Sequence, residues 1–291
     1  METTKQLIVL VGPCGSGKST LAKEYKDLGY EYINQDSQGK EHLNLFDLAI
    51  LAGKNVIVDR MGFSKQQRER YISLAKTKEY KTKIIVLHES YKTCFDRMML
   101  RQGHETIKDE KSARSALGMF FSKYERVQDV EADEVVRVWP PGPKALAAIF
   151  DLDGTLCNCE KRRHFVNKPK GEKKDWAGFF REISEDTLHL WCAEILKAFS
   201  YKYSIVLCSG RPDDYRKQTV EWLKKHGIVY ENLFMRPRND SRQDNITKEV
   251  ILDFEILTRY TPYIMIDDRQ QVVDMWRSRG YTCLQCDKGD F

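Results

Sequence analysis

The sequence contains no apolar run that approaches the roughly 20 residues of a membrane-spanning helix. Its first residues lead into a predicted strand and not into a signal peptide. Internal repeats and low-complexity tracts are also absent, which excludes a repeat architecture. We therefore predict an intracellular protein with no membrane partner.

Ligands for zinc are sparse. The chain has six histidines, and no histidine pair lies near the two close cysteine pairs, Cys157/Cys159 and Cys283/Cys286. The eight cysteines fall in strand, helix and loop patterns that do not suggest a disulfide framework. Because structural zinc needs four closely spaced nitrogen or sulfur ligands, the sequence favours reduced thiols over a zinc site.

The composition is typical of a globular protein with two domains. Hydrophobic residues make up 41% of the 291 positions and charged residues 31%, enough of each for domains with buried cores. The run Pro140-Pro141-Gly142-Pro143 predicts a linker over 140–144, between domains over 1–139 and 145–291. Strands alternate with helices in both halves, which predicts the α/β fold class. The net charge of +5 tolerates an anionic partner without requiring one.

A predicted phosphate-binding loop follows the first strand, Gln6–Val11. Residues 12–19 read G-P-C-G-S-G-K-S and match G-x-x-x-x-G-K-S/T, with a predicted helix directly after them. Glycines let backbone N–H groups point at phosphates, Lys18 would bridge the outer phosphates, and the Ser19 hydroxyl would reach magnesium. The predicted ATP-binding residues are Gly12, Gly15, Ser16, Gly17, Lys18, Ser19 and Thr20.

Two acids stand at the ends of the next predicted strands. Asp36 follows a strand over 30–34 and could accept a proton from an attacking hydroxyl, or cap the following helix. Asp59 follows a strand over 55–58. For Asp59, a contact close to the metal, a contact to the acceptor and a helix cap all stay open.

A basic helix is predicted over 91–101, with Arg97 and Arg101 on one face and a polar stretch at 104–108 after it. Enzymes with a glycine loop carry a lid at this place, and its arginines stabilise the transferred phosphoryl group. The alternative is an ordinary solvated helix face.

The second domain begins with A-I-F-D-L-D-G-T at residues 148–155, a strand that ends in two carboxylates. Asp151 can attack phosphorus and become an aspartyl-phosphate, and Asp153 can exchange a proton with the leaving oxygen and with water. Later groups complete a predicted site for magnesium-assisted phosphoryl transfer. They are the strand end Ser209, Gly210 and Arg211, the helical Lys248, which offsets crowded negative charge, and the strand end Asp267 and Asp268, one or the other of which would hold the cation with Asp151.

Between these motifs lies a basic stretch with aromatic neighbours, within 157–186. It contains Arg162, Arg163, Lys168, Lys170, Lys173, Lys174, His164, Phe165, Trp176, Phe179 and Phe180. Such a mixture could line a track for an extended anionic chain and its bases. It is as typical of a solvated loop over the site, and whether it forms a cap stays open.

The order D-x-D-G-T, S-G-R, lysine and D-D resembles the haloacid dehalogenase superfamily of phosphatases over 144–291. Ile266–Arg277 and the terminal G-D-F resemble the 3′-phosphatase half of phage-type polynucleotide kinase/phosphatases, and I-N-Q-D at 33–36 resembles the I-N-R-D segment of their kinase half. The resemblance implies an N-terminal P-loop kinase with a parallel sheet and a C-terminal haloacid dehalogenase-like, Rossmannoid phosphatase. Three places depart from the family: Gly39 replaces an arginine, the residues after Asp59 do not read D-T-N, and the loop over 157–186 is not clearly alike.

The resemblance also implies roles for the matching residues. It makes Asp36 the general base of the kinase, Asp59 a contact to the acceptor, and Arg101, with Arg97 beside it, the lid arginine. It makes Asp151 the nucleophile of the phosphatase and Asp153 its acid/base. The residues implied to bind substrate phosphate are Ser209, Arg211 and Lys248, with Asp244 nearby, and Gly210 and Asp244 are counted with the substrate-binding residues. Those implied to bind metal are Ser19, Asp151, Asp153, Asp267 and Asp268.

These features together predict a nucleic-acid end-healing enzyme that uses ATP and Mg²⁺. The kinase would phosphorylate 5′-hydroxyl ends of DNA or RNA, and the phosphatase would remove 3′-phosphates, which prepares ends for a ligase. The alternative is a small-metabolite or nucleoside kinase fused to a small-molecule phosphatase, and a third interpretation is a nucleic-acid binding module with relic sites. The expected location is the cytoplasm, that of the host if the chain is phage-encoded, and a homo-oligomer stays open.

Overall fold

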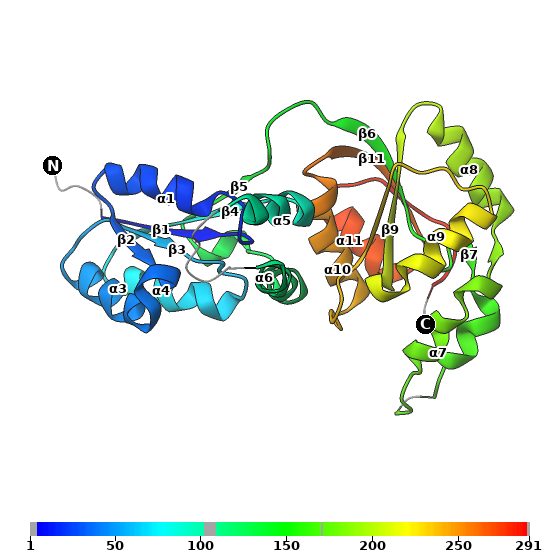
Figure 1. The fold of residues 1–291 in the computed structure, drawn as a ribbon, viewed down its shortest axis with the longest axis horizontal. Helices are drawn as coiled ribbons and strands as arrows, with labels where there is room; N and C mark the ends of the chain where they lie inside the picture. The colour runs from blue at the N-terminus through cyan, green and yellow to red at the C-terminus, as the bar shows by residue number, and fades with distance from the viewer. Residues whose placement is uncertain (1–4, 102–108, 170, 290–291) are drawn as a thin grey trace. The chain divides into compact units, whose positions relative to one another are not determined.

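The computed structural model describes residues 5–101, 109–169 and 171–289 (Figure 1). The chain divides into two compact units, Met1–Pro141 and Gly142–Phe291. Among the described residues, no helix is both long enough and apolar enough to cross a membrane. The polar stretch of the predicted lid, Lys170 and the last two residues of the G-D-F motif lie outside the described residues.

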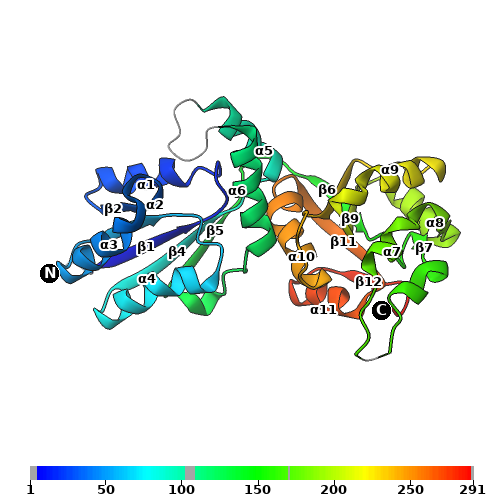
Figure 2. The ribbon, with the colours of Figure 1, turned by 60° about the horizontal axis from the view of Figure 1, so that its bottom comes forward.

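The first unit is built on a sheet in the order β2-β3-β1-β4-β5, in which all neighbours run parallel. The strands are β1 (Gln6–Val11), β2 (Glu31–Asn34), β3 (Val56–Asp59), β4 (Lys81–Leu87) and β5 (Glu134–Val138). The helices are α1 (Lys18–Asp27), α2 (Gln35–Gln38), α3 (His42–Leu51), α4 (Lys65–Thr77), α5 (Tyr91–Leu100) and α6 (Glu110–Lys123). After Gln6, β1 is apolar and buried, as a strand covered on both faces must be. Helix α1 covers one face, and α3 and α4 cover the other (Figures 1 and 2).

The strand order places the loop after β1 at a switch point. From β1 the chain builds β2 and β3 on one side and then β4 and β5 on the other. Open parallel sheets bind ligands at the carboxyl ends of the strands where the order reverses. The glycine loop at 12–19 therefore lies where this fold positions a ligand.

The second unit contains a sheet in the order β10-β9-β6-β11-β12, again with parallel neighbours. The strands are β6 (Ala145–Phe150), β9 (Ser204–Pro212), β10 (Asn232–Arg236), β11 (Tyr260–Asp267) and β12 (Cys283–Gln285), with a separate antiparallel pair of β7 (Cys157–Asn158) and β8 (Thr187–Leu188). The helices are α7 (Trp176–Arg181), α8 (Leu190–Ser200), α9 (Arg216–Lys225), α10 (Asp244–Ile251) and α11 (Gln270–Ser278).

Alternate residues of β6 enter two different cores. Ala148 and Phe150 pack in one core with residues of α8 and α9, whereas Ala147 and Ile149 pack in another with residues of α10 and α11. The sheet is thus covered on both faces. Strand β6 is the first of the unit and lies between β9 and β11, so Asp151, which follows it, also lies at a switch point.

Pairing between strands sets the bounds of two elements. Strand β9 extends past the apolar run at 205–208 to Pro212, because β10 pairs with it that far, and α9 begins only at Arg216. Helix α8 begins at Leu190, because the two residues before His189 pair with β7 instead. Both bounds come from pairing between distant segments, which local sequence preference does not reveal.

A buried ion pair in the first unit gives a test of stability. The Arg68 guanidinium on α4 donates to both carboxylate oxygens of Glu131, at 2.6 and 2.9 Å, and the side chains are 1% and 8% exposed. Arg68→Met leaves the Glu131 carboxylate without this partner. We expect the free energy of unfolding of this unit to fall by about 3–5 kcal/mol. Hydrogen exchange of the β1 amides measures the change.

Arg70 on the same helix is the matched control, because its partner Asp47 is exposed. Arg70→Met is expected to change the same quantity by less than about 1 kcal/mol. Adding Glu131→Gln to Arg68→Met removes the uncompensated charge and should recover part of the loss. Equal effects of Arg68→Met and Arg70→Met would contradict the importance of the buried pair.

Candidate active sites

Carboxylates from two adjacent strands surround one lysine in the second unit. Asp151 follows β6, Asp267 ends β11 and Asp268 comes next, and one oxygen of each lies within 4.8 Å of the others. Lys248 of α10 is fully buried. Its Nζ lies 2.8 Å from Asp151 Oδ1 and 2.8 Å from Asp267 Oδ2. The ammonium therefore offsets part of the negative charge that the strand ends concentrate.

Lys248 does not balance all of the negative charge of this cluster. Burial raises the pKa of the Asp151 carboxyl well above its usual range, although the Lys248 ammonium opposes the rise. Burial, followed by the negative charge of Asp267, raises the pKa of Asp268 to about 7. Asp268 Oδ2 is buried and has no hydrogen-bond partner in the described part of the chain. Such an oxygen calls for a positively charged group beside it.

Glycines let the backbone approach these carboxylates. Gly154, in the D-x-D-G-T turn, has a φ of +88°, and a Cβ there would lie 2.2 Å from Asp268 Oδ2. A Cβ on Gly210 would lie 2.1 Å from Asp244 Oδ1. A side chain at either position would therefore displace a carboxylate, which explains why glycine occupies both positions.

Two arginines hold Asp153 apart from the cluster. Arg211 donates to its carboxylate at 2.9 and 2.6 Å, and Arg162 donates to the same group. Burial by itself raises the pKa of Asp153, but the two guanidinium groups reverse this and hold the pKa well below its usual range. Asp186 accepts two hydrogen bonds from Arg162, at 2.7 and 2.6 Å. The position of Asp153 is thus determined by residues from three segments.

Three residues predicted as ligands of metal or phosphate have protein partners in the structure. Asp153 lies outside the cluster of Asp151, Asp267 and Asp268, and its carboxylate accepts from two guanidinium groups. It also belongs to a second group, with Cys157 and Asp186, whose ligand atoms lie within 4.8 Å of one another. Arg211 is buried and donates to Asp153, and Ser209 is buried and its Oγ accepts from the Arg211 N–H at 3.2 Å. The predicted roles of these residues towards metal and phosphate stay predictions.

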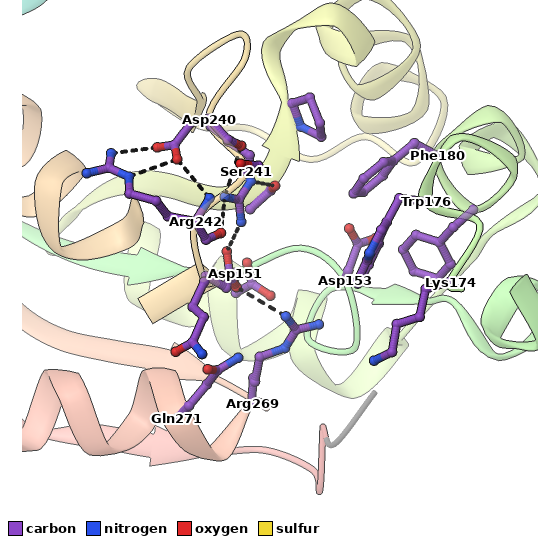
Figure 3. Close-up of a pocket in the computed structure, with 16 residues that line it drawn as sticks. Asp151, Asp153, Lys174, Trp176, Phe180, Asp240, Ser241, Arg242, Arg269 and Gln271 are labelled. Atoms are coloured by element: carbon purple, nitrogen blue, oxygen red, sulfur yellow. Dashed lines mark hydrogen bonds and ion pairs between the residues drawn. The ribbon is translucent and has the colours of Figure 1, made fainter. Parts of the chain in front are cut away.

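A cavity of about 500 Å³ opens beside the cluster (Figure 3). The polar side chains that line it are Asp151, Asp153, Lys174, Arg236, Asp240, Ser241, Arg242, Gln243, Asp244, Arg269 and Gln271. The aromatic part of the lining comes from α7. The volume lies within the range of small-molecule sites, roughly 300–1,000 Å³.

In the first unit, the glycine loop bends around its own lysine. Gly15 and Gly17 have φ values of +84° and +98°, and a Cβ on Gly15 would lie 2.6 Å from the Cys94 carbonyl oxygen. Lys18 begins α1, and its Nζ donates to the Pro13 carbonyl at 2.8 Å, which keeps the amine over the loop. Four of the predicted ATP-binding residues line a pocket: Gly15, Gly17, Lys18 and Ser19. Of the other three, Gly12 and Ser16 are buried and Thr20 is exposed.

The same pocket contains both predicted acids of this unit. Asp36 lies in the first turn of α2, but the residue that caps this helix is Asn34. Asp59 does not cap α4, whose N-cap is Ser64. The Asp59 carboxylate accepts from Tyr32 Oη and Asn34 Nδ2, each at 2.9 Å. The capping alternatives are therefore excluded, and both carboxylates stay available for chemistry in the pocket.

Arg60 and Arg101 line this pocket, whereas Arg97 does not. The Arg97 guanidinium donates to the Gly15 carbonyl at 3.2 Å and pairs with Glu89 at 3.0 Å. It thus contacts the glycine loop, and its role in substrate binding stays a prediction. Arg60, one of the residues that depart from the family pattern, stands beside the two acids.

Residues 145–291, half of the chain, match the family model of the polynucleotide kinase PNKP phosphatase domain. The chain belongs to this family. Residues 7–120 match the model of an AAA domain. The resemblance noted in the sequence is confirmed at this level, and so is the fold class of two parallel-sheet α/β units.

Two viral proteins are among the relatives of this chain. One from Autographa californica nuclear polyhedrosis virus, named as a bifunctional polynucleotide kinase/RNA ligase, is 27% identical over 312 residues, covering 95% of this chain and 42% of that protein. One from Acanthamoeba polyphaga mimivirus, named as a bifunctional polynucleotide phosphatase/kinase, is 37% identical over 79 residues, covering 26% of this chain and 19% of that protein. The chain spans less than half the length of these relatives.

A solved structure, that of the Pnkp1/Rnl/Hen1 RNA repair complex, contains a similar chain. It is 24% identical, with a TM-score of 0.44, and the match covers 100% of this chain and 98% of that one.

The residues of the phosphatase-domain site fit a divalent cation. Asp151, Asp267 and Asp268 offer only oxygen atoms, which hard cations such as Mg²⁺ prefer. The buried Asp268 Oδ2, unpaired among the described residues, is the atom that such an ion would satisfy. In the first unit, Lys18 and the N-terminus of α1 fit the phosphates of a nucleotide.

The sequence did not indicate the role of two residues that position a carboxylate of the phosphatase-domain site. Arg162 and Asp186 fall in the stretch interpreted as a basic track or a solvated loop, yet they hold Asp153 in place. Arg162 also lies over the Phe179 ring, 4.0 Å from its centroid. Its neighbour Arg163 pairs with the exposed Glu160. The two adjacent arginines look alike in the sequence, and only the burial of their side chains in the structure distinguishes their roles.

Divalent cations are expected to stabilise the second unit through its carboxylate cluster. In scanning calorimetry, MgCl₂ should raise the unfolding temperature of this unit, because an ion that binds the folded state shifts the equilibrium towards it. Asp268→Asn should abolish the shift. Asp274→Asn, which changes an exposed carboxylate of α11, should keep it. A magnesium shift of the same size in Asp268→Asn and wild type would contradict the proposed site.

Proposed function

We propose that this chain heals nucleic-acid ends. The first unit transfers the γ-phosphate of ATP to a 5′-hydroxyl, and the second removes a 3′-phosphate with Mg²⁺ as cofactor. The products, 5′-phosphate and 3′-hydroxyl ends, are those that a ligase joins. The observation that carries the proposal is that the family match over 145–291 coincides with the unit that holds the carboxylate cluster and its cavity. The names of the viral relatives, one of which includes an RNA ligase, support it.

Asp151 is the nucleophile of the phosphatase in this proposal. A carboxylate oxygen of Asp151 attacks phosphorus, the bond to the 3′-oxygen breaks, and an aspartyl-phosphate forms. Lys248, 2.8 Å from Asp151 Oδ1, favours the ionised form that attack requires. When bound, the divalent cation neutralises charge on the phosphoryl oxygens.

Asp153 is suited to the second step. Its two guanidinium partners favour the ionised carboxylate, which can accept a proton from the water that attacks the aspartyl-phosphate. The water oxygen bonds to phosphorus, the bond to Asp151 breaks, and inorganic phosphate leaves. Proton donation in the first step needs the protonated carboxyl, which the arginines oppose. The acid role implied for Asp153 therefore requires at least one of these contacts to be released.

The pocket of the first unit supplies the groups for phosphoryl transfer. Asp36 is exposed in it and can accept the proton of a 5′-hydroxyl, whose oxygen then attacks the γ-phosphorus as ADP leaves. Asp59 is held by Tyr32 and Asn34 and can contact the acceptor. Lys18 stabilises the charge on the transferred group.

A single doubly blocked substrate tests both activities. The substrate is an oligonucleotide with a 5′-hydroxyl at one end and a 3′-phosphate at the other. Wild-type protein with ATP and Mg²⁺ should phosphorylate the 5′ end and remove the phosphate from the 3′ end. Asp36→Asn should lose only the kinase activity and Asp151→Asn only the phosphatase activity, each by a factor of about 100 or more, because each removes a reacting group. Each variant is the control of the other, with both ends resolved by gel electrophoresis and mass.

Loss of both activities from either change would contradict separate sites. No change at either end with wild-type protein would contradict the proposed function. The small-molecule alternative predicts fast turnover of free nucleosides and 3′-mononucleotides and none of oligonucleotides, so these substrates belong in the same series.

Arg60 is expected to bind a phosphate of the acceptor strand. It lines the pocket with Asp36 and Asp59, and its guanidinium donates to Tyr71 Oη at 3.2 Å. Arg60→Ala should raise the KM for a 5′-hydroxyl oligonucleotide about tenfold, the size of one lost charge-assisted hydrogen bond, and leave the KM for ATP unchanged. Arg70→Ala, on the surface of α4, should change neither. A rise in the KM for ATP alone would assign Arg60 to the nucleotide instead.

A further inference from the structure

The cavity of the second unit has two chemically different walls. Asp151 and the segment around Arg242 form the polar wall, and Trp176, Phe179 and Phe180 form the aromatic one, with Asp153 beside Trp176. Figure 3 shows Trp176 and Phe180 together on one side of the cavity and Arg242 on the other. A phosphate group alone makes no favourable contact with aromatic rings. The aromatic wall therefore indicates a ligand that is larger than phosphate and partly apolar.

Trp176 is the accessible member of this wall. Its side chain is 39% exposed, whereas Phe179 and Phe180 are buried behind it. Phe180 stacks on Trp176 with centroids 5.9 Å apart and planes at 22°, and Phe179 meets it edge-on at 5.8 Å. Phe180 also contacts the Tyr215 ring at 5.3 Å. The indole is therefore held in place before any ligand binds, which lowers the entropy cost of stacking on it.

The aromatic wall is connected to the reacting groups. The Arg162 guanidinium lies 4.0 Å from the Phe179 centroid, on the residue that supports Trp176, and the same guanidinium binds Asp153. One continuous set of contacts thus connects the indole, through Phe179 and Arg162, to the Asp153 carboxylate. Lys174, whose Nζ lies 5.7 Å from the Trp176 ring centroid, adds a positive charge beside the platform.

We propose that Trp176 stacks the base of the terminal nucleotide while the 3′-phosphate of that nucleotide lies at Asp151. This inference rests on the proposed phosphatase function and specifies the substrate as a nucleotide that carries its base. Because every base has a flat π face, stacking accepts all four bases. Lys174 is placed to meet the backbone phosphate of the preceding nucleotide.

The test compares two oligonucleotides that differ only in the terminal base. Both carry a 3′-phosphate, and one has an abasic last nucleotide. Base stacking is worth about a 5- to 150-fold difference in kcat/KM, so the wild-type protein should prefer the base-bearing end by that factor. Trp176→Ala should bring the ratio close to one, mainly through KM, and Trp176→Phe should keep most of it.

Trp191→Ala is the matched control. Trp191 is an exposed tryptophan of the same unit, on α8 and outside the cavity lining, and its loss should leave the preference unchanged. Equal turnover of both ends by wild-type protein overturns the inference without any variant. A preference that survives Trp176→Ala overturns it as well.

A binding measurement separates this inference from the proposed function. Asp151→Asn, which cannot form the covalent intermediate, is titrated with both oligonucleotides and followed by fluorescence anisotropy. Tighter binding of the base-bearing end, lost on adding Trp176→Ala, supports stacking even if wild-type protein hydrolyses neither end. Turnover of both ends with equal binding leaves the proposed function intact and overturns the stacking.

Discussion

The contact on which the second unit depends most is the buried ammonium of Lys248 between Asp151 and Asp267. Parallel strands end at one edge of the sheet, so their terminal carboxylates are forced together, and each uncompensated buried ion costs several kcal/mol. Lys248 offsets two of these charges at once. Asp268 keeps a buried oxygen without a hydrogen-bond donor in the described part of the chain. The site is thereby stable enough to fold and still able to bind a cation.

The two units place groups of opposite charge at their sites. Each places its site at the carboxyl end of the first strand, where the strand order reverses. The first unit surrounds a phosphate position with backbone N–H groups and Lys18, so an anion is stabilised directly. The second presents carboxylates, which repel a phosphate unless a cation lies between them. This contrast explains why one motif is rich in glycine and the other in aspartate.

Much of the fold could be predicted from the sequence, because an apolar run followed by glycine or an acid is a local signal. Strand β1 has the predicted bounds, and Asp151, Asp267 and Lys248 meet in one site. The carboxylate partners of Arg97 and Arg211 could not be predicted, because Glu89 lies before the helix that carries Arg97 and Asp153 is remote in the sequence from Arg211. Motif membership places these residues near the sites and does not reveal their partners in the folded chain.

By itself, the sequence determined two α/β units, the strands that carry the reacting groups and the glycines that allow close approach. These features follow from hydrophobic pattern and backbone sterics, which act over a few residues. Only the tertiary structure decided which charges pair. It paired Arg162 and not Arg163 with Asp153, placed Asp153 outside the cluster of Asp151, Asp267 and Asp268, and set Trp176 across the cavity from Arg242. Charge pairing depends on burial and on distances between remote segments, and neither quantity exists until the chain has folded.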